Sequence, residues 1–377
     1  MSRVNKETEE VFFALLRAGL WHADNTEATD ISCYGGIDWQ SVYQLAQEQS
    51  VLGIVLAGLE YLNVRPPQGL LLQWIGEVQM IEQTNKAMNV FVALLVENMR
   101  KQDIYTLLVK GQGVAQCYER PLWRASGDVD FYLSDTNYEK AKRFFRPLVE
   151  SFDPDTDTAL HINMHYGEWV VEIHANQHCS ISSRANKVLD EIHKDLFYNG
   201  NVRSWLNGRT QVFLPSPDND ILLVFTHYLN HFYKGGLGVR QICDWCRLLW
   251  TYRDKVDIQL LETRLKKMGL ISVWKAFGAF AVDYLGMPAE AMPFYSSEAK
   301  WKSKANRIDI FIIKVGNFGH NRDAGYYGNK SKLTRKFFSF SRRCGDMLHH
   351  ARIFPLETFQ FFPQMVISGL IAVARGE

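Results

Sequence analysis

The segment 103–133 constrains the fold most, because the pattern of apolar residues changes there from helical to strand-like. Tyr105 to Val109 form a short, β-prone apolar run, and the turn 110-KGQG-113 follows it at once. A helical turn or two, a loop that contains Pro121 and a second strand-like run from Val129 to Leu133 come next. This order predicts a strand, a turn, a short helix and a second strand.

The next hundred residues or so extend this unit. The segment 137-NYEKAKRFFRPLVE-150 has the pattern of an amphipathic helix. Residues 160–166 and 168–174 read as a hairpin around Gly167. A mixed sheet with helices is therefore predicted, which is the α+β class.

Helical patterns flank this unit on both sides. Asp38 is placed to cap a helix over 39–62, and a longer helix is predicted from about 69 to 101. After about residue 200 the chain is predicted to return to helices. The predicted organisation has three parts, namely N-terminal helices (1–101), an α/β core (102–200) and C-terminal helices (201–377).

Composition limits the class of protein. A chain of 377 residues suits two or three domains, and a net charge of +1 argues against coating nucleic acid by bulk electrostatics. The six cysteines follow no small-domain disulfide pattern, and the charged N-terminus lacks a signal-peptide core. The apolar C-terminal segment 353–374 is interrupted by prolines and polar residues, so we expect a core helix and no stable membrane insertion. A reducing cytoplasm is the predicted location.

Asp128 and Asp130 stand two positions apart in the second predicted strand, so their side chains share a face. Two neighbouring carboxylates repel unless a cation shares the site; a solvated strand edge is the alternative. The turn with Lys110, Gly111 and Gly113 can approach a phosphate, because glycine presents no Cβ. A phosphate-binding turn beside paired carboxylates suits a hydrated Mg²⁺ and phosphoryl or nucleotidyl transfer.

The run 107-LLVKGQGVAQCYERPLWRASGDVDFYL-133 resembles the nucleotidyltransferase superfamily that includes polymerase β. It most resembles a bacterial family of uncharacterised nucleotidyltransferases with the signature L-K-G…Y…R-x-x-x-D-[IV]-D. The usual first motif of the superfamily, Gly-Ser or Gly-Gly, is replaced here by Lys-Gly, and the gap to the aspartates is longer. The matching positions are Lys110, Gly111, Tyr118, Arg124, Asp128, Val129 and Asp130.

The resemblance implies a nucleotidyltransferase-type mixed sheet with a third carboxylate on a later strand. Glu172 is the candidate, because strand alternation puts it on one face with Val170 and His174. Glu168 is the alternative at the turn, and a surface role for Glu172 stays open. Glu172 would be a metal ligand and a possible general base for the acceptor.

The resemblance also implies the other site residues. Asp128, Asp130 and Glu172 would hold Mg²⁺ or Mn²⁺, and Lys110, Gly111 and Gly113 would meet the triphosphate of an NTP substrate. Arg124 would stabilise its charge. Four histidines surround the predicted hairpin, and His174 is placed to bind a phosphate or orient Glu172, but their spacing matches no closed zinc site. They are His161, His165, His174 and His178.

The segment 227–245 is a further candidate from the C-terminal helices. His227 and His231 share a helical face, and a glycine-rich loop leads to Arg240 and Asp244. Lys234 or Arg240 would contact the nucleotide phosphates; the alternative is an inter-helix polar network in which Arg240 pairs with Asp244. Cys243-x-x-Cys246 has no second pair, so neither a redox nor a zinc role is expected.

The predicted function is Mg²⁺-dependent transfer of a nucleoside monophosphate from an NTP to an acceptor hydroxyl. The acceptor is open: a small molecule, a protein or an RNA. One alternative is a catalytically inactive nucleotide-binding or regulatory protein of the same fold. The other is a toxin-type transferase that modifies RNA through the basic segment 298–343, which holds 12 lysines and arginines against three acidic residues.

Overall fold

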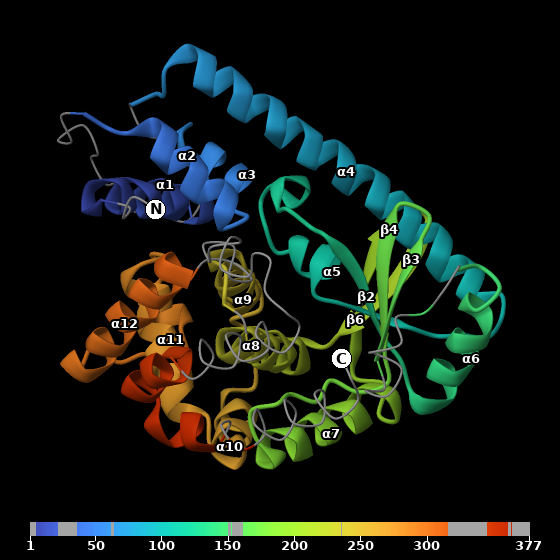
Figure 1. Cartoon of the computed structure of the whole chain (residues 1–377). Helices are drawn as coiled ribbons and strands as arrows, with labels where there is room; N and C mark the ends of the chain where they lie inside the picture. The colour runs from blue at the N-terminus through green and yellow to red at the C-terminus, as the bar shows by residue number, and fades with distance from the viewer. Residues whose placement is uncertain are drawn as a thin grey trace, which may run out of the picture.

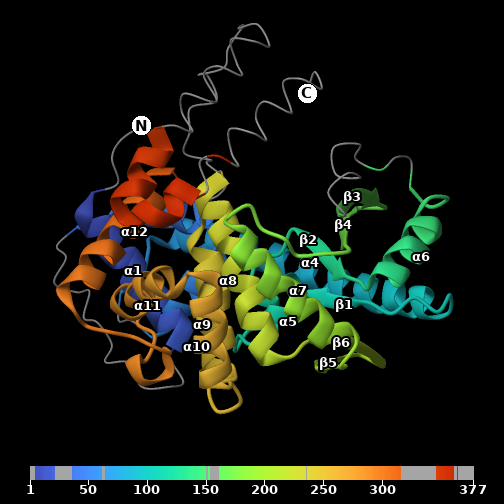
Figure 2. The same cartoon turned by 90° about the horizontal axis from the view of Figure 1, so that it is seen from below.

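A six-stranded mixed sheet with the order β3-β4-β2-β1-β6-β5 organises the computed structural model of the chain. The structure describes residues 5–21, 36–61, 64–149, 152, 161–234, 236–315, 345–360 and 363. Strands β2 and β4 run parallel, as do β1 and β6, and the other neighbours are antiparallel. The edge strands β3 and β5 lie at opposite ends of the sheet (Figure 2). The strands are β1 Leu107–Val109, β2 Asp128–Tyr132, β3 His161–Tyr166, β4 Trp169–His174, β5 Val202–Asn207 and β6 Thr210–Pro215.

Helices surround the sheet and build most of the described chain (Figure 1). The first three form a group at the N-terminal end, and α8 to α12 form a second group beside it. The labelled α-helices are α1 Lys6–Trp21, α2 Trp39–Glu48, α3 Leu52–Gly58, α4 Gln68–Arg100, α5 Gly111–Ala115, α6 Asp135–Phe145, α7 Ser183–Phe197, α8 Pro217–Lys234, α9 Val239–Thr251, α10 Ile258–Met268, α11 Ile271–Asp283 and α12 Ala299–Val315; the labelled short 3₁₀ helices are η2 Pro121–Trp123 and η4 Ala289–Ala291. Residues 345–353 and 355–360 are helical as well.

The two faces of the sheet contribute to two different hydrophobic cores. Leu108, Val129 and Val171 point into a smaller core that α4 and α6 cover. Leu107 and Val109, on the opposite face of β1, point into a larger core shared with the flanking helices. This alternation follows from the period of two in a strand. On β2 and β4, the face that corresponds to the larger core also carries Asp128, Asp130, Glu172 and His174, and these polar residues build the candidate site.

The predicted α+β fold with a mixed sheet is confirmed, and two local predictions are wrong. The predicted helix over 39–62 divides into α2 and α3, because Ser50 adopts a φ of 56° that no α-helix contains. The hairpin β5–β6 stands where helices were predicted after residue 200. Its signal is present in the sequence, since the two-residue loop Gly208–Arg209 separates two strand-like runs and Gly208 has a φ of 64°.

The N-terminal helices are held together by a close crossing of α1 and α3. A Cβ built on Gly19 would lie 1.9 Å from the carbonyl oxygen of Ile54, and one on Gly58 would lie 2.0 Å from that of Leu15. Only glycine allows these backbones to approach so closely. The crossing therefore depends on one glycine from each helix.

Two predicted segments reach beyond the described residues. Most of the basic segment 298–343 and of the apolar segment 353–374 lies outside them. Among the described helices, none combines the length and the apolar character that crossing a membrane needs. The division at residues 101 and 200, the cytoplasmic location and a bacterial origin stay predictions.

Candidate active site

The carboxylates of the candidate site are aligned by the pairing of β2 with β4. Asp130 is the register partner of Glu172, and Asp128 is the partner of Val170. Partners in adjacent strands point to the same face, so Asp130 and Glu172 lie side by side, with Asp128 two residues along the strand. The structure thus brings together the three predicted metal ligands. Glu168 lies outside β4, at the hairpin turn.

Lys110 supplies the nearest positive charge. It stands between β1 and α5 with φ 57° and ψ −143°, a conformation that costs a non-glycine residue about 1–3 kcal/mol. Its Nζ lies 2.7 Å from Oδ1 of Asp130, and both side chains are largely buried, with 14% and 3% exposed. Strain of this kind persists where surrounding contacts compensate for it, and the ion pair with Asp130 is such a contact.

The two aspartates differ in their electrostatic environments. Burial disfavours the charge of Asp130, but the ammonium of Lys110 and a hydrogen bond from His174 together lower its pKa below the usual range. The neighbouring Asp130 charge, followed by burial, raises the pKa of Asp128 to about 6. The negative charge of the three carboxylates exceeds what the Lys110 ammonium balances. An additional cation fits this arrangement.

His174 connects two of the carboxylates. Its Nε2 lies 3.0 Å from Oδ1 of Asp130 and 3.4 Å from Oε2 of Glu172. Burial opposes protonation, but the hydrogen bonds to both carboxylates raise the pKa of His174. His161 on β3 stacks on His174, with ring centroids 5.0 Å apart. The predicted contact between His174 and Glu172 is therefore present, and His161, another of the four histidines around the hairpin, joins it.

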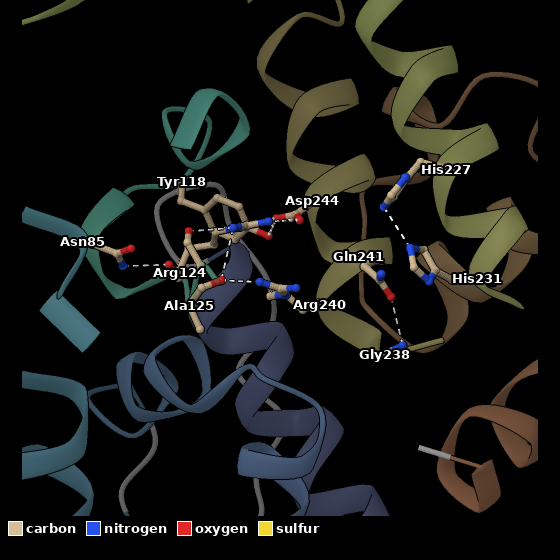
Figure 3. Close-up of polar contacts among 11 residues, drawn as sticks. Asn85, Tyr118, Arg124, Ala125, His227, His231, Gly238, Arg240, Gln241 and Asp244 are labelled. Carbon is tan, nitrogen blue, oxygen red and sulfur yellow. Dashed lines mark hydrogen bonds and ion pairs between the residues drawn. The ribbon is translucent and has the colours of Figure 1, made fainter. Parts of the chain in front are cut away.

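Helix α8 reaches the site through two histidines. Nδ1 of His227 lies 3.5 Å from Nζ of Lys110, and Nε2 of His227 lies 3.0 Å from Nε2 of His231. The two rings point toward one another along the helix (Figure 3). Burial and then the nearby Lys110 charge lower the pKa of both, that of His231 to about 4. Both imidazoles are consequently neutral near pH 7 and do not add to the positive charge of the site.

Arg124 lies in a buried network that ties the loop before β2 to α9. Its Nε and Nη2 donate to the two carboxylate oxygens of Asp244 at 3.0 and 2.5 Å, and Tyr118 donates to the same carboxylate at 2.8 Å (Figure 3). Its Nη1 donates to the carbonyl of Ala125 and to Ser126. Asp244 therefore pairs with Arg124, whereas the alternative interpretation of the sequence paired it with Arg240.

Arg240 approaches the same loop from α9. Its Nη1 donates to the carbonyl oxygen of Ala125, and its Nε has no hydrogen-bond partner among the described residues (Figure 3). Burial and then the charge of Arg124 lower its pKa, and the charge of Asp128 acts in the opposite direction. Arg240 is thus a guanidinium close enough to interact with Asp128 and with donor capacity to spare.

The two glycines of the turn have different surroundings. Gly111 begins α5 with a φ of 34°, and a Cβ there would meet only the carbonyl oxygen of Asp128, at 3.5 Å. A Cβ on Gly113 would lie 2.8 Å from Leu214 of β6. Packing of α5 against the sheet thus accounts for Gly113. Gly111 remains the better candidate for a phosphate contact.

The remaining candidates lie apart from the carboxylates. His178 pairs with Asp190 at 2.6 Å, and His165 is an exposed residue of β3. Cys243 and Cys246 are buried free thiols in α9. A buried amide pair was not anticipated: Gln112 donates to Asn85 of α4, which in turn donates to the carbonyl of Arg124. This pair holds the turn and the loop before β2 together.

The comparisons with known proteins agree with this geometry. A family model described as an uncharacterised nucleotidyltransferase matches residues 35–286, which run from just before α2 to just beyond α11. The match covers well over half of the chain, and the protein belongs to this family. Searches of curated proteins and of solved structures found no match. The predicted resemblance is therefore confirmed at the level of the family.

Proposed function

We propose that this protein is a metal-dependent nucleotidyltransferase that moves a nucleoside monophosphate from an NTP to an acceptor hydroxyl. The observation that carries the proposal is the register of Asp130 with Glu172, next to Asp128, in a member of a nucleotidyltransferase family. Three carboxylates on one face of two parallel strands are suited to a divalent cation. The acceptor is a small molecule, a protein or an RNA.

The metal ligands in this proposal are Asp128, Asp130 and Glu172. Hard oxygen donors suit Mg²⁺ or Mn²⁺, and the excess of carboxylate charge over the Lys110 ammonium fits such an ion. When bound, the ion would neutralise the charge on the transferring phosphate and on the pyrophosphate. The protein's part is to hold the three carboxylates in place through strand pairing.

The phosphate-binding groups in this proposal surround the carboxylates. Lys110 is held at the site by its backbone and by Asp130, and it would donate to a phosphate oxygen. Gly111 would let the backbone approach the phosphate without a clash. Arg240 has an unused Nε that could donate to a phosphate oxygen. Arg124 would act mainly by positioning the loop, because Asp244, Ala125 and Ser126 already accept from it.

The reaction conserves atoms in a single displacement. The acceptor oxygen attacks the α-phosphorus, the bond to the bridging oxygen breaks, and pyrophosphate leaves. Glu172 would accept the hydroxyl proton, because it is more exposed than Asp130, and the contact with His174 would orient its carboxylate. The neutral His227 and His231 would line the side of the site formed by α8.

The test is incorporation of label from each α-labelled NTP into a cell extract, with pyrophosphate release measured in parallel. Asp128→Asn and Glu172→Gln are expected to lower both by at least about 100-fold, because the metal ligands support transition-state charge. Glu168→Gln, at the adjacent turn, is the matched control and should retain activity. If the wild-type protein binds NTP without Mg²⁺ and releases no pyrophosphate, the proposal of a transferase is refuted.

The second candidate, a nucleotide-binding protein without transfer activity, is favoured by one observation. Oδ1 of Asp130 is already engaged by both Lys110 and His174. If these contacts persist when nucleotide binds, Asp130 can offer a metal only its other oxygen, Oδ2. Calorimetric titration with ATP separates the two, since the transferase needs Mg²⁺ for tight binding and this candidate does not.

A further inference from the structure

His161, Glu172 and His174 bring three metal-binding atoms together beside the aspartates. Nε2 of His174 lies 3.4 Å from Oε2 of Glu172, and Nε2 of His161 lies 3.8 Å from the same oxygen. One donor atom of each residue falls within 4.8 Å of the others. No other such group occurs within the described ranges of the chain. These contacts define a cluster distinct from the Asp128–Asp130 pair.

Strand pairing holds this cluster in place. His161 of β3 is the register partner of His174 of β4, and Glu172 lies two positions earlier on the same strand. All three side chains therefore share one face of the sheet, at its β3 edge. Each is partly exposed, so an ion can reach the cluster from solvent. The spacing along the chain conceals the arrangement, which only the antiparallel pairing of β3 with β4 creates.

The donor set has a clear metal preference. Two imidazole nitrogens and one carboxylate oxygen bind Zn²⁺ and related transition ions, whereas Mg²⁺ favours oxygen alone. Tetrahedral bonds of about 2.0–2.1 Å place neighbouring ligand atoms roughly 3.3–3.4 Å apart. The observed 3.4 and 3.8 Å separations need only a small side-chain movement to match. Three protein ligands also leave a fourth position open, as in catalytic zinc sites.

We propose that His161, Glu172 and His174 form a binding site for one divalent transition-metal ion of the Zn²⁺ class. The site shares Glu172 with the proposed nucleotidyl-transfer centre but stands on its own contacts. Binding through Nε2 removes the contact of His174 with Asp130, and Lys110 remains on that carboxylate. The site formed by His161, Glu172 and His174 at the β3 edge of the sheet is therefore selective for an ion that binds imidazole nitrogen.

The experiment measures metal binding and does not depend on activity. The full chain, first stripped with a chelator, is titrated with Zn²⁺ and with Mg²⁺ in a calorimeter, and with Co²⁺ while its visible absorption is recorded. The protein is expected to bind one equivalent of Zn²⁺. Its Co²⁺ form should show the visible absorption of an ion with four or five ligands. His161→Ala should weaken Zn²⁺ binding by at least about tenfold and abolish the spectrum. His165→Ala, on the same strand and exposed, is the control and should bind as the wild type does.

Equal Zn²⁺ affinity in the His161→Ala and His165→Ala proteins overturns the proposal, as does the lack of a Co²⁺ spectrum in the wild type. Circular dichroism of both variants excludes a folding defect as the cause of lost binding. Asp128→Asn separates this site from the transferase, since it should lower transfer by at least about 100-fold and retain the Co²⁺ spectrum. If the wild type shows the His161-dependent spectrum but no nucleotidyl transfer, the metal-site proposal stands and the proposed transferase function is refuted.

Discussion

Nζ of Lys110 lies 2.7 Å from Oδ1 of Asp130, and this ion pair joins the end of β1 to the middle of β2. The two strands are antiparallel neighbours, and Asp130 is the register partner of Val109, the residue just before the lysine. The pair thus lies within the sheet and is shielded from water. It couples the stability of the fold to the charge of the candidate site.

Removal of the lysine charge should destabilise the protein. Lys110→Met leaves Asp130 next to Asp128 and Glu172 with only His174 to offset its charge, so a loss of about 3 kcal/mol in the free energy of unfolding is expected. Urea denaturation measures it. Adding Asp130→Asn should recover most of the loss, because the uncompensated charge is then gone. If the free-energy losses of the two substitutions simply add in the double variant, Lys110 and Asp130 are not coupled.

The network around Arg124 should show a graded response. Asp244→Ala leaves the buried guanidinium without its bidentate partner and should cost about 3–5 kcal/mol. Tyr118→Phe removes a single hydrogen bond to the same carboxylate and should cost about 1 kcal/mol. Denaturant unfolding of both variants gives the order. Equal losses would mean that Asp244 acts through the tyrosine and not through the ion pair.

Gly58 at the α1–α3 crossing and Gly76 in α4 make a matched pair for glycine-to-alanine substitution. Gly58→Ala places a Cβ 2.0 Å from the carbonyl oxygen of Leu15, so the helices must separate, at a cost of about 1–3 kcal/mol. Gly76→Ala, inside α4, meets nothing within 4 Å and should stabilise the protein by about 0.5–1 kcal/mol. Thermal unfolding of the two variants compares them directly. If Gly58→Ala leaves the melting temperature unchanged, the α1–α3 crossing tolerates the extra volume.

Asp309 of α12 should make stability depend on pH. Burial, followed by a hydrogen bond with Glu9 and the charge of Glu9, raises its pKa to about 9. In the unfolded chain Asp309 ionises near its ordinary pKa of about 4. Between about pH 4 and about pH 9, the folded protein therefore holds a proton on Asp309 that the unfolded chain has lost. Stability from this group therefore falls as pH rises from about 4 to about 9, by at most about 1.4 kcal/mol per pH unit.

Asp309→Asn removes this titration. The melting temperature of the variant relative to wild type should rise between about pH 5 and about pH 8, because only the wild type loses stability through this group. Asp254→Asn, whose side chain is 87% exposed in the wild type, controls for the loss of one carboxylate. A difference between Asp309→Asn and wild type that stays constant with pH would show that Asp309 is ionised in the fold.

Local patterns were sufficient for much of the candidate site. Strand alternation places Asp128 and Asp130 on one face and Glu172 on one face with Val170 and His174, and the pairing of β2 with β4 bears out that geometry. The turn position of Glu168 is what favours Glu172 over it. These predictions succeed because side-chain direction along a strand depends only on neighbouring residues. The hairpin β5–β6 also has a local signal, the two-residue turn Gly208–Arg209, although helices were predicted there.

The sequence by itself determined the α+β class, the family and the shared face of the aspartates. Only the tertiary structure decided that β2 and β4 are parallel neighbours, that Arg124 pairs with Asp244, and that His161 faces His174. The physical reason is separation along the chain. Strand order and helix packing bring together residues 13 to 120 positions apart, and no local periodicity encodes those distances.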